Sequence, residues 1–319
     1  MNRRDAIKTV SGVVGALAVG HIPGRSARAD DKPAPKSPPD FNTARIETTK
    51  LRDGLHLISG PGGNIAASVG ADGALLVDSG VAGRTDGIVA AVATLSPKPI
   101  RTLVNTHWHL DHAGGNEALG KAGVVIVAHD NTRTRLSTEQ EIAIVKMKVP
   151  AAPEAARPRV TFSDTLTLHH NGDELHVRHV APAHTDTDCW IFFRRANVLH
   201  LGDLYFNGTY PFIDSSSGGR LDGMIAASEA ALKVVDKDTK IIPGHGPVGG
   251  IADLRRYLTL LTDLRDLFRP LIAAGKTLPE VIAAKPTQKL DTVYGAGFLS
   301  GDLIAEVIYR SMTAERAGK

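Results

Sequence analysis

The feature that most constrains this chain is the segment Thr106-His107-Trp108-His109-Leu110-Asp111-His112. The β-favouring run 100–105 precedes it, and Ala113-Gly114-Gly115-Asn116 follows as a turn that can begin a helix. The three histidines and the aspartate are therefore expected on a loop at the carboxyl end of a strand. In sheets with helical crossovers, binding sites are built at that end.

The spacing of these side chains favours metal binding. Residues two apart in an extended segment project to the same side, so His107 and His109 can bind one cation. Asp111 and His112 lie beyond the bend and are placed for a neighbouring cation. Imidazole and carboxylate are both ligands that zinc accepts. The alternative is a run of surface histidines. This alternative is less favoured when further metal-ligand residues occur elsewhere in the chain.

Three further segments each provide one such partner. Each is an apolar, strand-like run that leads to a ligand-type residue: 174–180 before His184, 198–203 ending in Asp203, and 241–247 with His245 between two glycines. Strands that each deliver one such residue at the carboxyl end are the pattern expected when a sheet edge assembles a metal site.

Taken together, these segments resemble the metallo-β-lactamase superfamily, in its branch of glyoxalase II-like and β-lactamase-like binuclear zinc hydrolases. The upstream segment Leu76-Val77-Asp78-Ser79-Gly80 fits the same pattern. The resemblance implies an α/β fold, a four-layer αββα sandwich, with two zinc ions (Zn2+) per chain at one sheet edge. It implies a first zinc held by His107, His109 and His184, a second held by Asp111, His112 and His245, and Asp203 as the bridge.

The resemblance also implies an enzyme, a metal-dependent hydrolase that acts on a small-molecule substrate. A hydroxide shared by two cations and oriented by the catalytic residue Asp111 would attack an amide, ester or thioester, as in a β-lactam, a lactone or a thioester. Asp203 as a bridge resembles the thioester, lactone and phosphodiester hydrolases of the superfamily, and the cysteine and lysine typical of one β-lactamase group are missing. Export, in contrast, suits a periplasmic β-lactamase-like enzyme, so a β-lactam stays one of the candidate substrates. Two alternatives stay open: an iron-dependent persulfide dioxygenase-like oxidoreductase and a non-catalytic metal-binding periplasmic protein.

Three other residues are candidates for supporting roles. Asp78 follows a strand and either caps the next helix or, as the resemblance suggests, orients a metal-binding histidine. Tyr205 and Tyr210 lie in the aromatic and hydroxyl-rich stretch 204–219, which is predicted to be a loop that contacts substrate. Either hydroxyl could donate a hydrogen bond to a developing oxyanion, and ordinary loop packing is the alternative.

Residues 1–29 are predicted to be an export signal peptide. Paired Arg3 and Arg4 precede a short apolar run, 9–19, and the cleavage-type sequence Ala27-Arg28-Ala29. The arginine pair resembles a twin-arginine signal, although Ala6 stands where a bulky residue is usual and leaves the ordinary secretion route open. A retained anchor is disfavoured because the apolar run is shorter than the roughly 20 residues of a membrane span. The sequence thus predicts a periplasmic protein that uses the export machinery and has no stable membrane insertion after cleavage.

Charge and cysteine content narrow the functional classes. The full chain carries a net charge of +3, but residues 1–29 hold five basic residues and one acidic residue, so the remainder is near −1. No basic stripe with interleaved aromatic residues is left to favour nucleic acid as a partner. The single cysteine, Cys189, lies in an apolar run and is expected to pack in the core. His169, His170, His176 and His179 are predicted to lie on a hairpin surface rather than to form a further metal site.

Residues 30–40 are Pro-rich and predict an extended linker, and residues 41–319 are predicted to form the hydrolase domain. Strands are expected at 55–58, 65–70, 74–78 and 124–128, and a hairpin at 165–168 and 175–177. Helices are expected at 83–95, 222–235 and 253–268, with a last one carrying residues 303–312. The section 131–159 is expected to form a helix and then a flap over the site.

Overall fold

The computed structural model describes residues 40–313 of the chain. The predicted signal peptide at 1–29 lies outside the described residues, as does the predicted linker at 30–40 except for Asp40. Within the described part, no helix has both the length and the apolar composition that a membrane crossing requires.

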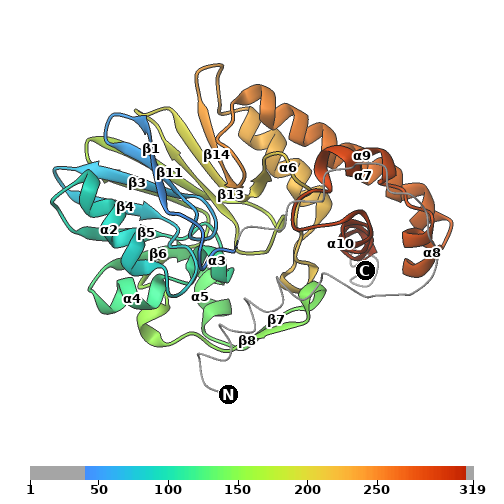
Figure 1. Cartoon of the computed structure of the whole chain (residues 1–319), viewed down its shortest axis with the longest axis horizontal. Helices are drawn as coiled ribbons and strands as arrows, with labels where there is room; N and C mark the ends of the chain where they lie inside the picture. The colour runs from blue at the N-terminus through green and yellow to red at the C-terminus, as the bar shows by residue number, and fades with distance from the viewer. Residues whose placement is uncertain (1–39, 314–319) are drawn as a thin grey trace.

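Two β-sheets form the centre of the molecule (Figure 1). The seven-stranded sheet has the order β1-β2-β3-β4-β5-β6-β9, formed by Glu47–Arg52, Leu55–Ser59, Ile65–Gly70, Gly73–Val77, Ile100–Val104, Val125–His129 and Val160–Phe162. The five-stranded sheet runs β10 to β14 in order, formed by Thr165–His170, Asp173–His179, Cys189–Phe193, Val198–Phe206 and Lys240–His245.

Alternating side chains explain why the sheets stack. Successive residues of a strand point to opposite faces, so a strand that is apolar throughout must be covered on both sides. In β4, Leu75 and Val77 face the second sheet, whereas Leu76 packs on the other face with α2 (Thr85–Leu95) and α4 (Asn116–Lys121). The predicted core cysteine, Cys189, is buried between the two sheets.

The outer face of the five-stranded sheet is covered by three further helices. They are α6 (Leu221–Leu232), α7 (Ile251–Ala273) and α10 (Gly301–Thr313), and their buried side chains share one apolar cluster with the strands beneath them. The layers therefore run helix, sheet, sheet, helix (Figure 1), which confirms the predicted αββα sandwich. The predicted helices at 83–95, 222–235, 253–268 and the chain end correspond to α2, α6, α7 and α10.

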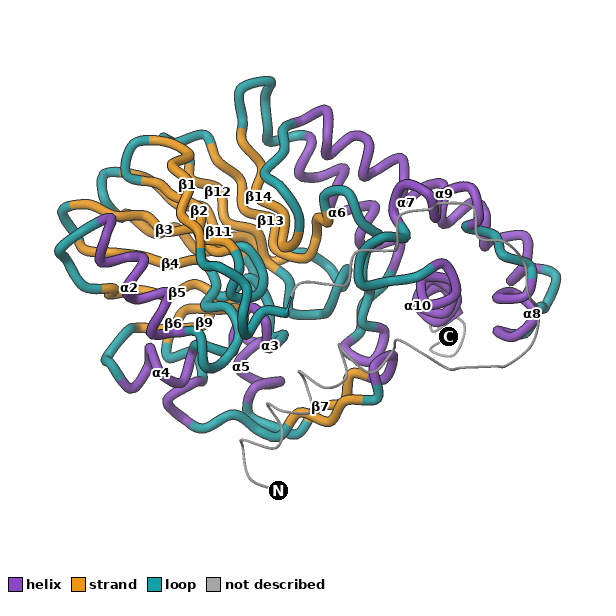
Figure 2. Tube along the Cα trace, viewed as in Figure 1, coloured by secondary structure: helices purple, strands orange, loops and turns teal. Residues whose placement is uncertain are grey.

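The section 131–159 contains more structure than the sequence indicated. The expected helix is α5 (Asp130–Leu136), but the expected flap is a small hairpin, β7 (Gln140–Ile142) and β8 (Met147–Val149), seen in Figure 2. Ile142 and Val149 pack with Leu136 and with Trp108 of the histidine-rich segment. The hairpin is thus fixed by apolar contacts to the loop that carries the candidate ligands.

The strand that carries Asp203 does not end there, contrary to prediction. β13 continues to Phe206, and its parallel pairing with β14 shifts register near Gly202 before Phe206 pairs with His245. Gly202 adopts a positive φ of 52°, which suits a residue without a side chain at such an irregularity. The apolar run 204–206 then extends the strand, because both of its faces are buried.

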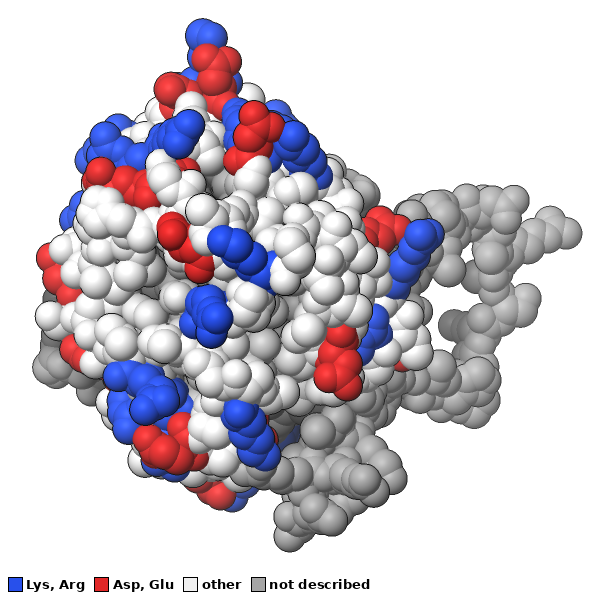
Figure 3. Space-filling model, turned by 90° about the vertical axis from the view of Figure 1, so that its left-hand side faces the viewer, with Lys and Arg blue, Asp and Glu red and all other residues white. Residues whose placement is uncertain are grey.

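The short helices α3 (Leu110–Ala113), α8 (Leu278–Ala283) and α9 (Gln288–Tyr294) complete the fold. On the face at the left of Figure 1, which Figure 3 turns toward the viewer, Lys and Arg side chains are interspersed with Asp and Glu. That face therefore carries charges of both signs without separation into patches.

Candidate metal centre

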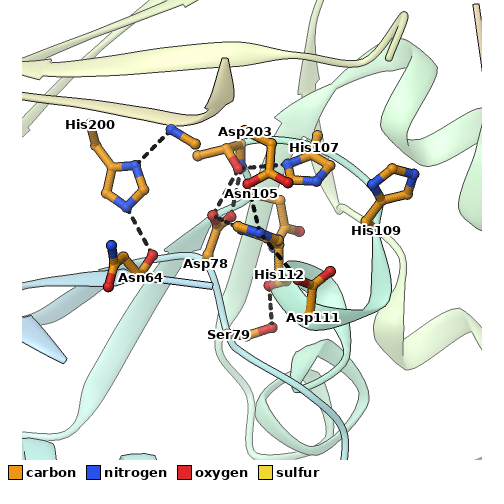
Figure 4. A network of polar contacts seen from close by, with 12 residues as sticks. Asn64, Asp78, Ser79, Asn105, His107, His109, Asp111, His112, His200 and Asp203 are labelled. Atoms are coloured by element: carbon orange, nitrogen blue, oxygen red, sulfur yellow. Dashed lines mark hydrogen bonds and ion pairs between the residues drawn. The ribbon is translucent and has the colours of Figure 1, made fainter. Parts of the chain in front are cut away.

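All seven predicted ligand-type side chains converge at one edge of the sandwich, although they come from four parts of the chain. Three sets of side chains have ligand atoms within 4.8 Å of one another: His107, His109 and His184; His107, His112 and Asp203; and Asp111, His112 and His245. We call His107, His109 and His184 the first group, and Asp111, His112 and His245 the second group. His107 and His109 lie between β5 and α3, and Asp111 and His112 lie on α3 itself. His184 follows β11, and Asp203 and His245 lie on the parallel pair β13 and β14. Figure 4 shows His107, His109, Asp111, His112 and Asp203 gathered there.

In the first group, one ring nitrogen of every histidine is hydrogen-bonded to an acceptor oxygen. His109 Nε2 donates to Asp214 Oδ2 at 3.1 Å, and His184 Nδ1 donates to the carbonyl oxygen of Phe212 at 2.7 Å. His107 Nδ1 lies 3.0 Å from Thr106 Oγ1. These contacts fix the tautomers, so His107 Nε2, His109 Nδ1 and His184 Nε2 are left with lone pairs that face one another.

In the second group, Asp111 and His245 face His112. His112 Nδ1 donates to Asp78 Oδ2 at 2.8 Å, which directs its Nε2 toward the group. His245 Nε2 lies 3.1 Å from Asp111 Oδ2 and 3.3 Å from His112 Nε2. Each side chain thus contributes one ligand atom to the same small space.

Asp203 lies between the two groups. Its Oδ1 is 3.0 Å from His112 Nε2 and 3.5 Å from His245 Nε2, on the side of the second group. Its Oδ2 is 3.5 Å from His184 Nε2, on the side of the first. One carboxylate therefore presents one oxygen to each group, which is the arrangement that a bridging ligand requires.

The donor set fits divalent cations. His109 Nδ1 and His184 Nε2 are only 2.8 Å apart although neither carries a hydrogen, and His107 Nε2 is buried without a hydrogen-bond partner among the described residues. Lone pairs this close repel each other and cost free energy when they are buried unpaired. Imidazole nitrogens and carboxylate oxygens around such a space are the ligands of zinc and of similar transition metals.

The histidines of the two groups differ in pKa. Burial lowers the pKa of His184 to about 4 and that of His107 well below its usual value, so both stay neutral. Burial also opposes a charge on His112 and His245, but neighbouring carboxylates, chiefly Asp203, outweigh it. They raise the pKa of His245 to about 9 and that of His112 well above its usual value. The second group thus has the stronger attraction for positive charge.

Asp78 supports both groups from beneath. Its carboxylate accepts from His112 Nδ1 and, at 2.7 Å each, from the backbone N and the Oγ1 of Thr106, which in turn accepts from His107. The next helix, α2, has Arg84 at its N-cap and begins at Thr85, so Asp78 does not cap it. Of the two predicted roles, the structure places the carboxylate in the orienting one.

Asp78→Asn tests this support, because asparagine also tolerates the left-handed φ of 66° found at this position. The new amide would direct a donor at either His112 Nδ1 or Thr106 Oγ1, both of which donate. We expect the affinity for a divalent metal ion to fall by about 10- to 100-fold with the fold retained. Competition with a chelator of known affinity measures this, and an unchanged affinity would contradict the assignment.

Gly244 and Asn64 position the backbone around Asp203 and His245. A Cβ at Gly244 would lie 1.8 Å from Asp203 Oδ1, so only glycine fits beside the carboxylate. Asn64 donates from Nδ2 to the carbonyl oxygens of Pro243 and Gly246, at 2.9 Å each, on either side of His245. These contacts hold the end of β14 against the loop before β3.

Sequence reasoning missed Asp214, the partner of His109. Asp214 is buried, and it also accepts hydrogen bonds from Ser216 and Ser217. Burial by itself would raise the pKa of Asp214, but His109 and these hydrogen bonds outweigh it and hold the pKa well below the usual range. The sequence Asp-Ser-Ser-Ser is typical of a turn in which the aspartate accepts from the backbone two residues on. That signal predicts a fixed carboxylate but not which histidine it contacts.

The predicted substrate loop is corrected by the structure. Tyr205 belongs to β13, is fully buried and packs edge-on against Tyr257 of α7 with ring centroids 5.1 Å apart. Tyr210 is buried as well, and its hydroxyl donates to Asp291 Oδ1 of α9 at 2.7 Å. Both rings attach the strand edge to the C-terminal helices, which is the packing alternative. The Tyr210 hydroxyl is engaged by Asp291, and the Tyr205 hydroxyl is buried without a hydrogen-bond partner among the described residues.

The other histidines within residues 40–313 lie outside these groups. His169 and His176 are on the hairpin β10–β11, where His176 contacts Glu174, and His179 stacks on His129. His200 is buried on β13, but its Nε2 donates to the carbonyl oxygen of Asn64 and its Nδ1 accepts from Gly202 (Figure 4). Both ring nitrogens of His200 are therefore used within the fold.

Comparison with known proteins identifies the family. The family model described as the metallo-beta-lactamase superfamily matches residues 60–246, which is more than half of the chain and includes all seven side chains. The chain belongs to the metallo-β-lactamase superfamily. A curated relative from Aquifex aeolicus (strain VF5), described as an uncharacterized protein, is 28% identical over 145 residues. That match covers 45% of this chain and 66% of the relative, just under two thirds of its length.

Solved structures of the superfamily share the fold. A metallo-beta-lactamase from Pontibacter korlensis has a TM-score of 0.57 and 22% identity, over 68% of this chain and 99% of that one. A metallo beta lactamase from Hirschia baltica has a TM-score of 0.54 and 23% identity, over 68% of this chain and 97% of that one. At such identities the likeness concerns the fold alone.

Proposed function

We propose that the chain is an exported binuclear zinc hydrolase that cleaves an amide, ester or thioester bond of a small molecule. The observation that carries the proposal is Asp203, whose two oxygens face two different groups of histidines at 3.0–3.5 Å. A single-metal or purely structural site would not need a carboxylate shared in this way. Membership of the superfamily supports the same reaction class.

In this proposal, His107, His109 and His184 hold one zinc ion, and Asp111, His112 and His245 hold the other, with Asp203 between them. A pair of bound zinc ions lowers the pKa of a shared water toward neutrality and polarises a carbonyl oxygen. A β-lactam, a lactone and a thioester all offer a carbonyl of this kind.

The chain's own residues would position the reacting water. The Asp111 side chain is 28% exposed, whereas that of His112 beside it is fully buried. Although burial opposes it, attraction to His112 and His245 holds the pKa of Asp111 well below the usual range, so its carboxylate stays ionised. An ionised carboxylate at the border of the buried cluster can accept a hydrogen bond from water and orient it.

The test is hydrolysis by the purified full chain, stripped of metal with a chelator and then supplied with zinc. Nitrocefin, an acyl lactone and an acyl thioester represent the three substrate classes. We expect hydrolysis of at least one of them, lost on chelation and recovered with zinc. Oxygen uptake with a persulfide by the iron-loaded chain, without hydrolysis by the zinc-loaded chain, would favour the dioxygenase alternative instead.

Export is the second part of the proposal and rests on the N-terminal sequence. Residues Arg3 and Arg4 followed by a short apolar run support a twin-arginine signal that would deliver the folded protein to the periplasm. Replacing both arginines with lysine should leave the uncleaved precursor in the cytoplasm. Periplasmic delivery unaffected by that change would exclude this route.

A further inference from the structure

Half-exposed apolar side chains surround the His109 and His184 side of the cluster. The ring of Phe212 lies 6.0 Å from that of His109 and 5.8 Å from that of His184, measured between centroids. Phe298, which precedes α10, meets Phe212 edge-on at 6.2 Å and is 40% exposed. An aromatic surface therefore runs outward from two candidate ligands to the solvent.

The hairpin β7–β8 extends the same surface. Ile144 and Met147 are partly exposed, and both pack in one apolar cluster with Leu110 and Phe212. Leu110 directly precedes Asp111 at the start of α3. We call Leu110, Ile144, Met147, Phe212 and Phe298 the apolar rim.

An aromatic residue also flanks the other side of the cluster. The ring of Phe41 lies 6.2 Å from that of His245. Arg84 holds this segment in place, because its guanidinium donates to the carbonyl oxygens of Phe41 at 2.9 Å and of Ala44 at 2.5 Å. The position of Phe41 is therefore fixed by the domain itself.

Two of these phenylalanines lie outside the part of the chain that the family model covers. They are Phe41 and Phe298, and the matched part is residues 60–246. The ion pairs formed by the seven ligand-type side chains join histidine only to aspartate. A group that binds beside His109 and His184 meets the apolar side chains of the rim.

We propose that the apolar rim binds a hydrophobic acyl or aryl group of the substrate, and that Phe298 is a specificity-determining residue. This inference rests on the proposed function and names the substrate class of the same site. An apolar group laid against Phe212 would place its neighbouring carbonyl beside His109 and His184. Short, charged substrates would leave the rim exposed to water and gain nothing from it.

A series of straight-chain hydroxamates tests the proposal without turnover. Acetohydroxamate, hexanohydroxamate and octanohydroxamate share one metal-binding group and differ only in apolar length. Titration calorimetry on the zinc-loaded full chain should show affinity rising about two- to threefold per added methylene. Phe298→Ala should weaken octanohydroxamate about 5- to 10-fold and change acetohydroxamate less than about twofold.

Two further variants serve as controls. Val293→Ala removes a more exposed apolar side chain, 62% exposed, from α9 and should leave all three affinities unchanged. Phe298→Leu keeps an apolar contact and should restore part of the dependence on chain length. A flat series with normal acetohydroxamate binding, or an equal loss for short and long probes in Phe298→Ala, would overturn the inference but not the proposed function. Failure of acetohydroxamate itself to bind the zinc-loaded chain would overturn both.

Discussion

Asp203→Asn should lower hydrolysis by about 10³-fold or more and weaken the binding of both zinc ions. Asparagine keeps the shape of the side chain but loses the negative charge and one of the two acceptor oxygens. Because the oxygens of Asp203 face different groups, one group would meet an amide nitrogen in place of a ligand oxygen, and both groups would lose the negative charge between them. The pKa values of His112 and His245 would also fall, because Asp203 is the main carboxylate that raises them.

Zinc content after dialysis and initial rates measure this effect. Asp86→Asn is the matched control, because Asp86 is exposed on α2 outside the cluster, and it should behave like the unchanged protein. Two tightly bound zinc ions in Asp203→Asn, with more than a tenth of the activity, would contradict the bridging role.

His109→Ala should abolish activity and remove one zinc ion while leaving the other. Alanine deletes one of three imidazole ligands of the first group and removes the histidine partner of the buried Asp214 carboxylate. The second group keeps Asp111, His112 and His245, so about one ion per chain should remain.

His169→Ala provides the control for this variant, since His169 is an exposed histidine on β10. Circular dichroism checks that both variants fold. Full activity in His109→Ala would remove the first group from the mechanism. A loss of both ions there, matching Asp203→Asn, would contradict the division into two groups.

The sequence predicted the site better than its surroundings. The ends of these strands can be located in the sequence, because an apolar run followed by histidine or aspartate is unusual in a buried sheet. Parallel neighbouring strands then bring such ends together. His107, His184 and His245 were found in this way. The seven side chains then lie within reach of one another although up to 138 positions separate them, as the distances show.

What the sequence did not predict depends on contacts between distant segments. Asp214 reaches His109 only through the path of the loop after β13, and Asn64 reaches the end of β14 across the edge between the two sheets. Tyr205 was assigned to a loop because aromatic and hydroxyl residues follow it, yet burial on both faces of β13 extends the strand. The hairpin β7–β8 was missed because three-residue strands carry almost no periodic signal.

The most direct test of the two-metal site is to locate the metal in crystals of the zinc-loaded protein by anomalous scattering. We expect two peaks, one on each side of the Asp203 carboxylate, about 3.5–4 Å apart as in other binuclear hydrolases. One peak should lie among His107, His109 and His184, and the other among Asp111, His112 and His245. A single peak, or zinc bound elsewhere with these seven side chains free of metal, would contradict it.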